Sequence, residues 1–398
     1  MSLSYLLLIL TILTLPVDIV QFSALNLRPW NLFAFLGFVL LLINLFKKRE
    51  PIRAPFGWLF FLYLLANIVS LFNSVAISYS VIQLLKIIFI DVTLYLFIVN
   101  VINNTEILER VYKYLGLVGI YVGGFGIVQM VAAWYFHLNW MPWNYNLIGP
   151  PAWFTEKTWY GNFMVMIFAY SLILAPVFFK RRWLAVAFNL FVVFCVLIST
   201  SRSAIVAMIA LLALNEASKW RDLSARKVIG RVLLLILLGG MLALMMVPQL
   251  QSSTIWSRFT AERNQDRTSV VDVAVNAIYQ HPIIGNGIGT WGEAAGLSMR
   301  WPATFNIFLT ALYDGGAAVF SALALMIIIF FWQTYHVLCQ AKNDNSAVLL
   351  KASLFGVVSV FIVSQFHPYY LSGYAWLAIA IAAVAAYVIK KDSLKEKN

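Results

Sequence analysis

One arginine stands where two apolar runs meet. Arg202 lies in the segment ISTSRSAIV, at the start of the second run. An arginine buried in a membrane helix costs about 2.5 to 3.5 kcal/mol on insertion scales, so a partner should offset that cost. Unpaired N–H groups at the helix start, with the hydroxyls of Ser199, Thr200, Ser201 and Ser203, are donors suited to a phosphate. The alternative is that Arg202 extends to lipid headgroups.

A second arginine, Arg267, comes directly before a segment with amphipathic helical spacing. If Thr268 is the N-cap of that helix, the Arg267 guanidinium also lies beside a helix amino terminus. Two arginines placed in this way could clamp a diphosphate through paired N–H bonds. The alternative is a neutral loop of ion pairs, because this segment carries as many acids as bases. These residues are Arg258, Arg263, Arg267 and Arg300, and Glu262, Asp266, Asp272 and Glu293.

Lys86 and Asp91 are charged residues within one apolar segment. Ionised side chains inside a membrane usually face a cavity of the helix bundle. Because the two residues are five positions apart, they do not share a face of an α-helix and are not expected to pair. Lys86 is therefore a candidate ligand for a phosphate or a sugar. The alternative is a structural ion pair between Lys86 and Asp18 or Asp314.

The segment QHPIIGNGIGTW contains His281 and closely spaced glycines. Dinucleotide binding is excluded because no strand precedes this segment and no βαβ unit surrounds it, so the glycines are expected to allow a tight turn. His281 stays a candidate proton acceptor, and so does His367, although a single histidine there is more often a hydrogen-bonded interface residue. No cluster of ligating residues has metal-site spacing, so neither a metal nor another cofactor is expected.

Tryptophans crowd the chain between residues 134 and 159. A belt at the membrane interface is the commoner role of such residues, and a stacking surface for sugar rings is the alternative. Trp143 and Trp153 are the candidates for sugar contact.

Membrane helices must position all of these residues. Of 398 residues, 62% are apolar and 11% are charged, against roughly 25% charged in soluble domains. This composition excludes an ordinary soluble enzyme. The net charge is +12, which in a soluble protein would suggest nucleic-acid binding. In so apolar a chain, the expected partner is a lipid bilayer. Two cysteines are too few for a disulfide framework or a cysteine metal cluster.

Twelve apolar segments could cross about 30 Å of hydrocarbon. They are residues 3–20, 30–46, 56–73, 79–101, 113–135, 159–179, 183–199, 203–217, 230–248, 304–335, 349–366 and 373–389. The tenth is expected to break at Gly315 and Gly316. With both termini in the cytoplasm, most lysines and arginines fall on the inner side. The exceptions are Arg28, Lys86, Lys157, Arg202, Arg258, Arg263, Arg267 and Arg300.

We predict a single integral membrane domain over residues 1–398, with two large outer loops at 136–158 and 249–303. The first loop is rich in aromatic residues. In the second loop, Val270, Val271, Ala274, Ala277 and Ile278 share one helical face, opposite Ser269, Asp272 and Asn276. This amphipathic helix is expected to lie on, or dip into, the outer membrane surface.

Three motifs, in their order, resemble one family. SRSAIV begins an apolar segment, DRTSVVDVAVNAIYQHPIIGNGIGTW lies in the second loop, and FNIFLTALYDGG opens the next segment. Over residues 199–320 this arrangement resembles the O-antigen ligase and polysaccharide polymerase superfamily. The resemblance implies an all-α, GT-C-like polytopic protein that takes a glycan from undecaprenyl diphosphate. It also implies a site at the outer face of the bacterial inner membrane that acts without a metal.

The resemblance assigns roles to both arginines. Arg202 and Arg267 match the two diphosphate-binding arginines of the family, with Val206 in place of the leucine of the first motif.

The ligase branch of the family carries a further motif that this chain matches in part. Asn306, Asp314 and Gly316 match it, but Phe305 occupies the position of its histidine. Because phenylalanine cannot accept a proton, this departure favours a polymerase over a ligase.

We therefore expect an inverting, metal-independent glycosyltransferase that polymerises repeat units of a surface polysaccharide. Arg202 and Arg267 would stabilise the leaving diphosphate, and a proton acceptor would come from Asp266, Asp272, His281 and Glu293, among which the sequence does not choose. Further substrate-binding candidates are Lys86, Arg258, Arg263, Arg300, Asn306, Asp314, Trp143 and Trp153.

The expected partners are the undecaprenyl-diphosphate-linked glycan and membrane lipid. No nucleic acid is expected, and other polysaccharide-assembly proteins are compatible with this interpretation. One alternative is an O-antigen ligase that transfers the glycan to a lipid acceptor. A second alternative is a secondary transporter of twelve spans, which should show paired halves with broken helices.

Overall fold

The computed structural model describes residues 3–18, 27–136, 150–218, 262–294, 304, 306–341, 344–366 and 372–395. Within these ranges the chain is built of helices and forms no β-sheet. The expectation of an all-α protein is therefore confirmed for the described residues.

The helices follow the predicted apolar segments closely. The amino-terminal elements are α1 (Leu3–Thr14), α2 (Pro29–Lys48), α3 (Gly57–Ser70), η1 (Leu71–Asn73), α4 (Ile77–Lys86), η2 (Ile87–Val92), α5 (Thr93–Val101) and α6 (Thr105–Tyr135). The remaining elements are α7 (Lys157–Phe178), α8 (Arg182–Ile198), α9 (Arg202–Ala217), α13 (Glu262–Gln280), α14 (Trp291–Ala294), α15 (Ile307–Gln340), α16 (Asp344–Ser364) and α17 (Gly373–Lys395). The predicted segment 230–248 lies outside the described residues.

Seven of the described helices are long and apolar enough to cross a membrane. Three more, α1, α8 and the joined α3 and η1, are apolar but shorter. The protein is therefore an integral membrane protein of many spans, and the predicted total of twelve stays a prediction.

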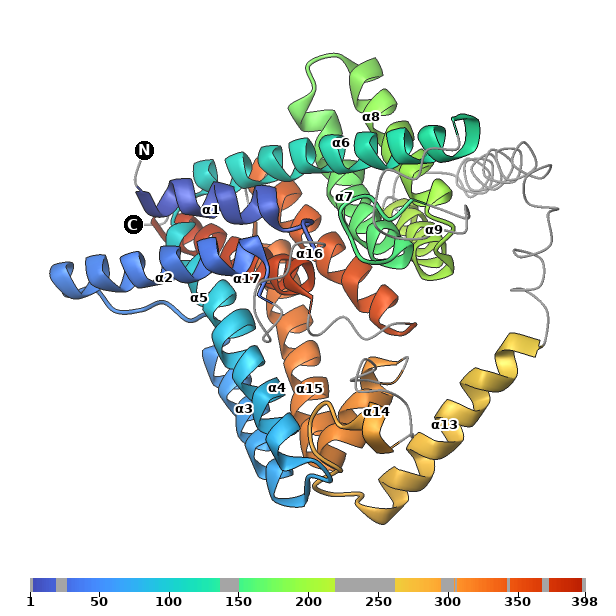
Figure 1. Ribbon diagram of the computed structural model, residues 1–398. Coiled ribbons are helices and arrows are strands. Elements are labelled where there is room, and N and C mark those ends of the chain that lie inside the picture. The colour runs from blue at the N-terminus through green and yellow to red at the C-terminus, as the bar shows by residue number, and fades with distance from the viewer. Residues whose placement is uncertain are drawn as a thin grey trace.

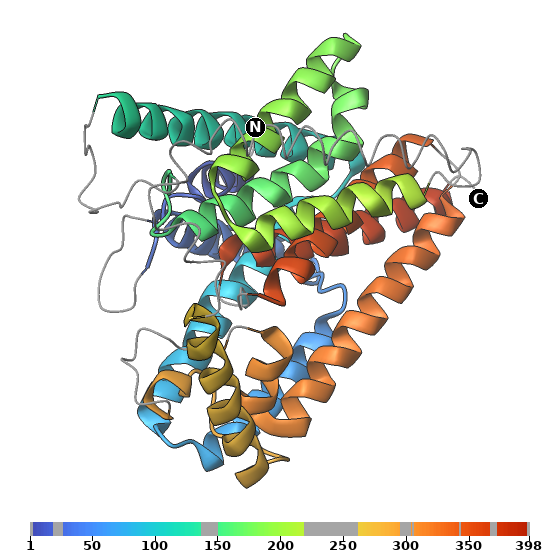
Figure 2. The same ribbon diagram turned by 90° about the vertical axis from the view of Figure 1, so that its right-hand side faces the viewer.

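The helices form two groups, which Figures 1 and 2 show from two sides. The first group contains α1, α2, α6, α7, α8, α9, α16 and α17, and the second contains α3, α4, α13, α14 and the beginning of α15. Two long elements run between the groups: the element formed by α4, η2 and α5, and the helix α15.

The core of the first group is built around α7 and α17, the most deeply buried of the spanning helices. Along α17, Ala378, Ala382 and Ala385 are fully buried. Small side chains let helix backbones approach closely in a membrane, where packing replaces the hydrophobic effect as the driving force. This explains how α17 packs at once against α16, α5 and α15.

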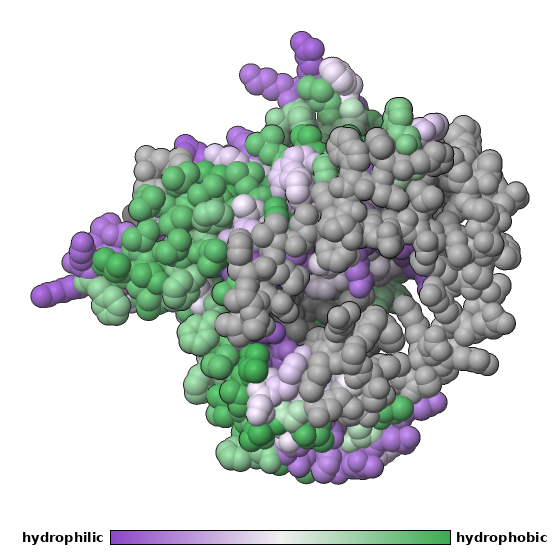
Figure 3. Space-filling view, viewed as in Figure 1, coloured by the Kyte–Doolittle hydropathy of each residue, from purple (hydrophilic) through white to green (hydrophobic). Residues whose placement is uncertain are grey.

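Apolar side chains also cover much of the outer surface, and Figure 3 shows them gathered over α2 and along α3 and α4. Phe46 is 77% exposed and Phe72 is 87% exposed. Large exposed apolar areas of this kind are suited to lipid and not to water.

The predicted break in α15 is confirmed. Gly315 has φ −138° and ψ 20°, and Gly316 has φ 61° and ψ −153°, so the helix is interrupted at these two residues. A positive φ is open to glycine at little cost, which explains why the break falls here.

The predicted start of the amphipathic helix was wrong. Helix α13 already includes Glu262, so Thr268 is not its N-cap. The expected position of this helix at the outer membrane surface stays a prediction. Within the described chain, Ala274 is fully buried, Ala277 and Ile278 pack with Trp291 of α14, and Val271 is 42% exposed. The polar residues before Thr268 include good helix formers, which extend the helix without an apolar pattern.

Candidate functional site

Arg202 is the first residue of α9, as predicted, and its side chain is exposed. A short turn joins α9 to the end of α8. Within this turn Thr200 has φ 53°, a left-handed conformation that is rare for a β-branched residue. Strained backbone of this kind costs about 1 to 3 kcal/mol and is found mostly at functional sites. The turn is therefore a candidate site in its own right.

The serines around Arg202 hold this turn together and do not face outward. The Ser203 hydroxyl donates to Asn162 Oδ1 of α7 at 3.0 Å, and it lies 3.0 Å from the Ser201 hydroxyl. The Ser201 hydroxyl also accepts from the Ala204 N–H, which makes Ser201 the N-cap of α9. Ser199, Ser201 and Ser203 are all buried. The expectation that these three hydroxyls bind a phosphate was therefore wrong.

Two further basic residues lie around the first turn of α7, next to the Arg202 turn. Lys157 Nζ donates to the Thr200 hydroxyl at 2.8 Å. Arg28, which precedes α2, lies over the Trp159 ring at 5.8 Å from its centroid. We call Arg28, Lys157 and Arg202 the basic cluster. All three are exceptions to the expected charge bias, and the structure gathers them at one end of α7.

Two acidic residues lie beside this cluster. Asp18 forms an ion pair with Arg28 and accepts a hydrogen bond from the Thr155 hydroxyl at 2.9 Å. Glu156 precedes α7 but makes no capping bond with its side chain. Burial, and to a smaller extent the charge of Asp18, raises the pKa of Glu156 above its ordinary value. The cluster therefore joins three cations to one paired carboxylate, Asp18, and has a second carboxyl group with raised proton affinity beside it.

Lys86 lies at the end of α4, half-buried, on the element that runs between the two helix groups. Within the described part of the chain Lys86 forms no ion pair with Asp18 or Asp314, so that alternative does not hold there. The prediction assumed a regular α-helix at Asp91, but Ile87–Val92 form a π-helix, a feature often seen at functional sites.

The glycine-rich segment, residues 281–290, docks onto the break in α15. The Asn286 N–H donates to the Tyr313 carbonyl at 2.9 Å, and the Ala317 N–H donates to the Pro282 carbonyl at 2.8 Å. Backbone groups that the break leaves without helical partners are thus satisfied by this segment. The expectation of a tight turn is met, since Gly285, with φ 78°, and its two neighbouring glycines have positive φ.

Asp314 belongs to this docking interface. Its side chain is 3% exposed and accepts a hydrogen bond from the Gly289 N–H at 3.1 Å, while its carbonyl accepts from the Gly287 N–H at 2.9 Å. The described contacts of Asp314 therefore favour a structural role over the predicted role in substrate binding.

Asn306 has a structural role as well. Its Oδ1 accepts from the Phe308 and Leu309 N–H groups, so Asn306 is the N-cap of α15. Its Nδ2 donates to the Gln365 carbonyl at 3.2 Å.

The candidates on α13 are not beside Arg202. Arg267 lies in the second turn of α13, so the prediction that it stands just before a helix amino terminus was wrong. Asp272 is exposed on α13, and His281 is half-buried just after its end. Figures 1 and 2 both show α13 in the second helix group, whereas α9 is in the first.

Trp153 stacks on Phe125, with ring centroids 4.5 Å apart and planes 16° apart, and packs against the core of the first group. This contact fixes the indole within the protein. Several predicted residues lie outside the described structure. The whole residues outside it are Trp143, Arg258, Arg300, Phe305 and His367. Only the side chains lie outside it for Arg263, Asp266, Arg267 and Glu293.

Four residues of this site were not predicted from the sequence as site residues: Arg28, Glu156, Lys157 and Asn162. A signal for Arg28 and Lys157 was present, because both stand among the exceptions to the charge bias. Nothing in their spacing, however, shows that they meet Arg202.

These features define a polytopic α-helical membrane protein with a basic site at the junction of α7 and α9. Residues 187–321 match the family model described as O-antigen ligase. The chain thus carries a region of the O-antigen ligase and polymerase superfamily, which confirms the resemblance and supports a function in processing glycans at a membrane. The matched region includes Arg202, the glycine-rich segment and the break in α15. No curated protein sequence matches the chain.

Proposed function

We propose that this protein is an inverting, metal-independent glycosyltransferase that extends a glycan carried on undecaprenyl diphosphate, at the outer face of the bacterial inner membrane. The observation that carries the proposal is the basic cluster. In it, exposed Arg202 and half-buried Lys157 lie at a strained turn, within and beside the region that matches the O-antigen ligase family. Cationic groups held in place before the reaction stabilise charge as it develops on a leaving group.

The reaction needs few groups. The oxygen of an acceptor hydroxyl attacks the anomeric carbon, and the bond from that carbon to the carrier diphosphate breaks. The diphosphate leaves with the bonding electrons, and the hydroxyl proton passes to a base. We assign the diphosphate to Arg202 and Lys157, because an arginine fork and a lysine ammonium both bind phosphate oxygens well.

Glu156 is the proton acceptor that this geometry favours. It adjoins Lys157 in sequence, has no capping bond, and has a raised pKa. A base with a pKa closer to the working pH is more effective in general catalysis. Asp272 and His281, in the second helix group, remain alternatives for a substrate that spans both groups.

A polymerase is our first choice because Phe305 stands where the ligase branch has histidine. A ligase is the second candidate, and it is the activity after which the matching family model is described. The two activities differ in their product. We expect purified protein in lipid vesicles to convert carrier-linked repeat units into a ladder of longer glycans on the same carrier. Transfer only to a different lipid acceptor would instead establish a ligase.

A further inference from the structure

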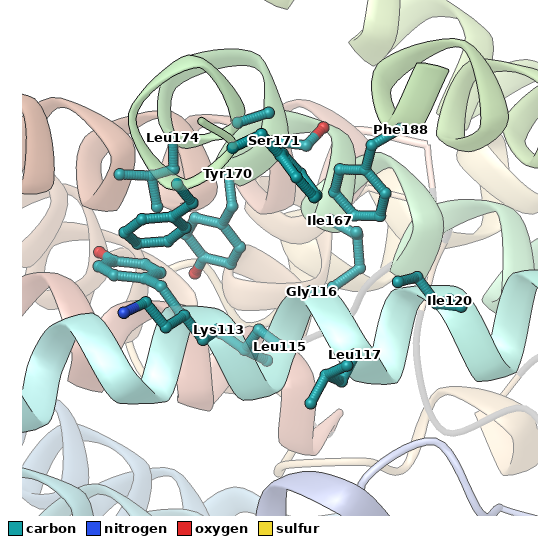
Figure 4. Close-up of a pocket in the computed structure, with 14 residues that line it drawn as sticks. Lys113, Leu115, Gly116, Leu117, Ile120, Ile167, Tyr170, Ser171, Leu174 and Phe188 are labelled. Atoms are coloured by element: carbon teal, nitrogen blue, oxygen red, sulfur yellow. The ribbon is translucent and has the colours of Figure 1, made fainter. Parts of the chain in front are cut away.

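A cavity of about 320 Å³ lies between α6, α7 and α8, away from the basic cluster (Figure 4). Its walls are mainly apolar and include Ile120, Ile167, Leu174 and Phe188. A single water takes about 30 Å³ and needs two to four polar partners, so an apolar space of this size is not a water site. Its volume is at the lower end of the roughly 300 to 1,000 Å³ typical of small-molecule sites.

The cavity has a clear cause in the sequence of α6. Where α6 packs closely on its neighbours, a Cβ added at Gly119 would collide with Ile167, and one added at Gly123 would collide with Phe191 and Cys195. Gly116 lies one turn earlier, where a Cβ would meet only Phe188 Cζ, at 4.0 Å. The close packing therefore ends at Gly116 and leaves a space.

This space borders the surface that faces lipid. Leu117 and Ile120 line the cavity and are also 55% and 46% exposed. An apolar cavity that stays empty loses dispersion contacts along its walls. Around a membrane protein, the apolar molecule at hand to restore those contacts is a lipid acyl chain.

One end of the cavity is positively charged. Figure 4 shows Lys113 at one end and Ile120 at the other. Lys113 Nζ lies 5.4 Å from the Phe178 ring, and within the described chain no carboxylate forms an ion pair with it. Phe179, which also lines the cavity, is followed directly by the exposed residues Lys180, Arg181 and Arg182. The acids on the preceding turns of α6 have other described partners, since Glu106 pairs with Arg110 and Glu109 accepts a hydrogen bond from Asn345 Nδ2 at 2.8 Å.

The same region contains a buried hydroxyl without a partner. Tyr170 lines the cavity and is 4% exposed, and its hydroxyl has no hydrogen-bond partner within the described chain. This hydroxyl lies close to Gly356 of α16, which does not line the cavity, so Tyr170 contributes its ring to the wall and the proposal does not depend on its hydroxyl.

We propose that this cavity binds one acyl chain of an anionic phospholipid, whose phosphate is held by Lys113 and the basic residues at 180–182. An anionic headgroup matches the charge at this end, and the chain fills the apolar part. This site is separate from the basic cluster, so its test does not depend on the proposed transferase activity.

The full-length protein is purified from vesicles that contain equal amounts of phosphatidylglycerol and phosphatidylcholine, and its retained lipid is measured by native mass spectrometry. The wild type should retain phosphatidylglycerol in preference to phosphatidylcholine. Gly116→Leu fills the cavity, so its retained phosphatidylglycerol should fall about tenfold, equivalent to about 1.4 kcal/mol. Gly124→Leu is the matched control on the same helix, since a Cβ there meets nothing within 4 Å, and it should retain lipid as the wild type does.

Lys113→Gln tests the headgroup and stays informative if Gly116→Leu fails to fold. This variant should show a clearly weaker preference for phosphatidylglycerol, because only the basic residues at 180–182 then hold the phosphate. The proposal is overturned if folded Gly116→Leu retains as much phosphatidylglycerol as Gly124→Leu. It is also overturned if the wild type shows no preference for the anionic lipid, or if Lys113→Gln keeps that preference undiminished.

Discussion

Arg202 and Lys157 show what residue types can and cannot reveal. An arginine at the boundary of an apolar run is unusual enough to be predicted as functional, and the structure places it at the start of α9. Lys157, which belongs to the same basic cluster, is 45 positions away from Arg202 in sequence. It nevertheless donates a hydrogen bond to the Thr200 hydroxyl, two positions before Arg202. Contacts between distant segments of this kind are set by helix packing, which residue spacing does not record.

The serines beside Arg202 were assigned to the wrong partner for a related reason. A hydroxyl can bind a phosphate or another side chain equally well. Asn162, on α7, supplies the second kind of partner, and burial of Ser201 and Ser203 follows from it. Similarly, the amide of Asn306 serves α15 as its N-cap.

At this scale the pH dependence of Glu156 is a testable prediction. If its carboxylate accepts the proton, only the ionised form is active, so activity falls as pH drops through the pKa. Because the pKa of Glu156 is raised, this acid limb should lie at higher pH than for an ordinary carboxyl. Glu156→Gln should lower the rate by about 10² to 10⁴ and remove the limb.

His281→Ala serves as the comparison in that experiment, with rates measured across pH on carrier-linked glycan. It should cost little activity, because His281 lies in the other helix group. A folded but inactive His281→Ala, together with an active Glu156→Gln, would assign the base to His281.

At the scale of elements, apolar runs predicted most helices well, and local signals predicted the break in α15. The start of α13 was missed because its first residues are polar and carry no apolar period. The π-helix at Ile87–Val92 has no clear sequence signal either. The docking of the glycine-rich segment onto α15 joins residues about thirty positions apart, and only the folded chain shows it.

Gly316→Ala tests this docking. A φ of 61° with a ψ of −153° is open almost only to glycine, and it costs a residue with a Cβ about 1 to 3 kcal/mol. The added Cβ would also meet the Ile283 carbonyl carbon at 2.5 Å, so backbone must move as well. We expect a lower melting temperature in detergent and a loss of stability of at least about 1 to 2 kcal/mol.

The matched control is Gly124→Ala, at an open helical position, which should be neutral or stabilise by up to about 1 kcal/mol. Equal melting temperatures for the two variants would show that the docked segment does not depend on the conformation of Gly316.

At the scale of the whole molecule, composition was sufficient to predict a polytopic membrane protein, because too few polar residues are present to cover a surface in water. It was not sufficient to show that the helices form two groups, or that the basic cluster and α13 lie in different ones. Those features depend on how α15 and the α4–α5 element run between the groups.

Metal independence is a prediction about the complete enzyme. Among the described residues, no three His, Cys, Asp or Glu side chains are grouped as metal ligands. We expect the basic cluster to stabilise diphosphate charge in the way that metal ions do in other enzymes. Glycan transfer should therefore be unchanged in excess chelator. A loss of activity that a divalent ion restores would contradict this mechanism.

The role of Arg202 in stabilising the leaving diphosphate is tested most directly by comparing two arginines that occupy the same helical position. Arg202 is the first residue of α9 and Arg182 is the first residue of α8, and both side chains are exposed. The end of α8 joins the start of α9 through a short turn, so the two arginines lie at opposite ends of α8.

Each arginine is replaced by alanine, folding is checked by melting temperature, and the rate of glycan extension on undecaprenyl diphosphate is measured in vesicles. Loss of one donor to a developing anion typically lowers kcat by about 10² to 10³. We predict a loss of this size for Arg202→Ala and near-normal activity for Arg182→Ala. A folded Arg202→Ala protein that extends glycans as fast as Arg182→Ala would contradict this prediction.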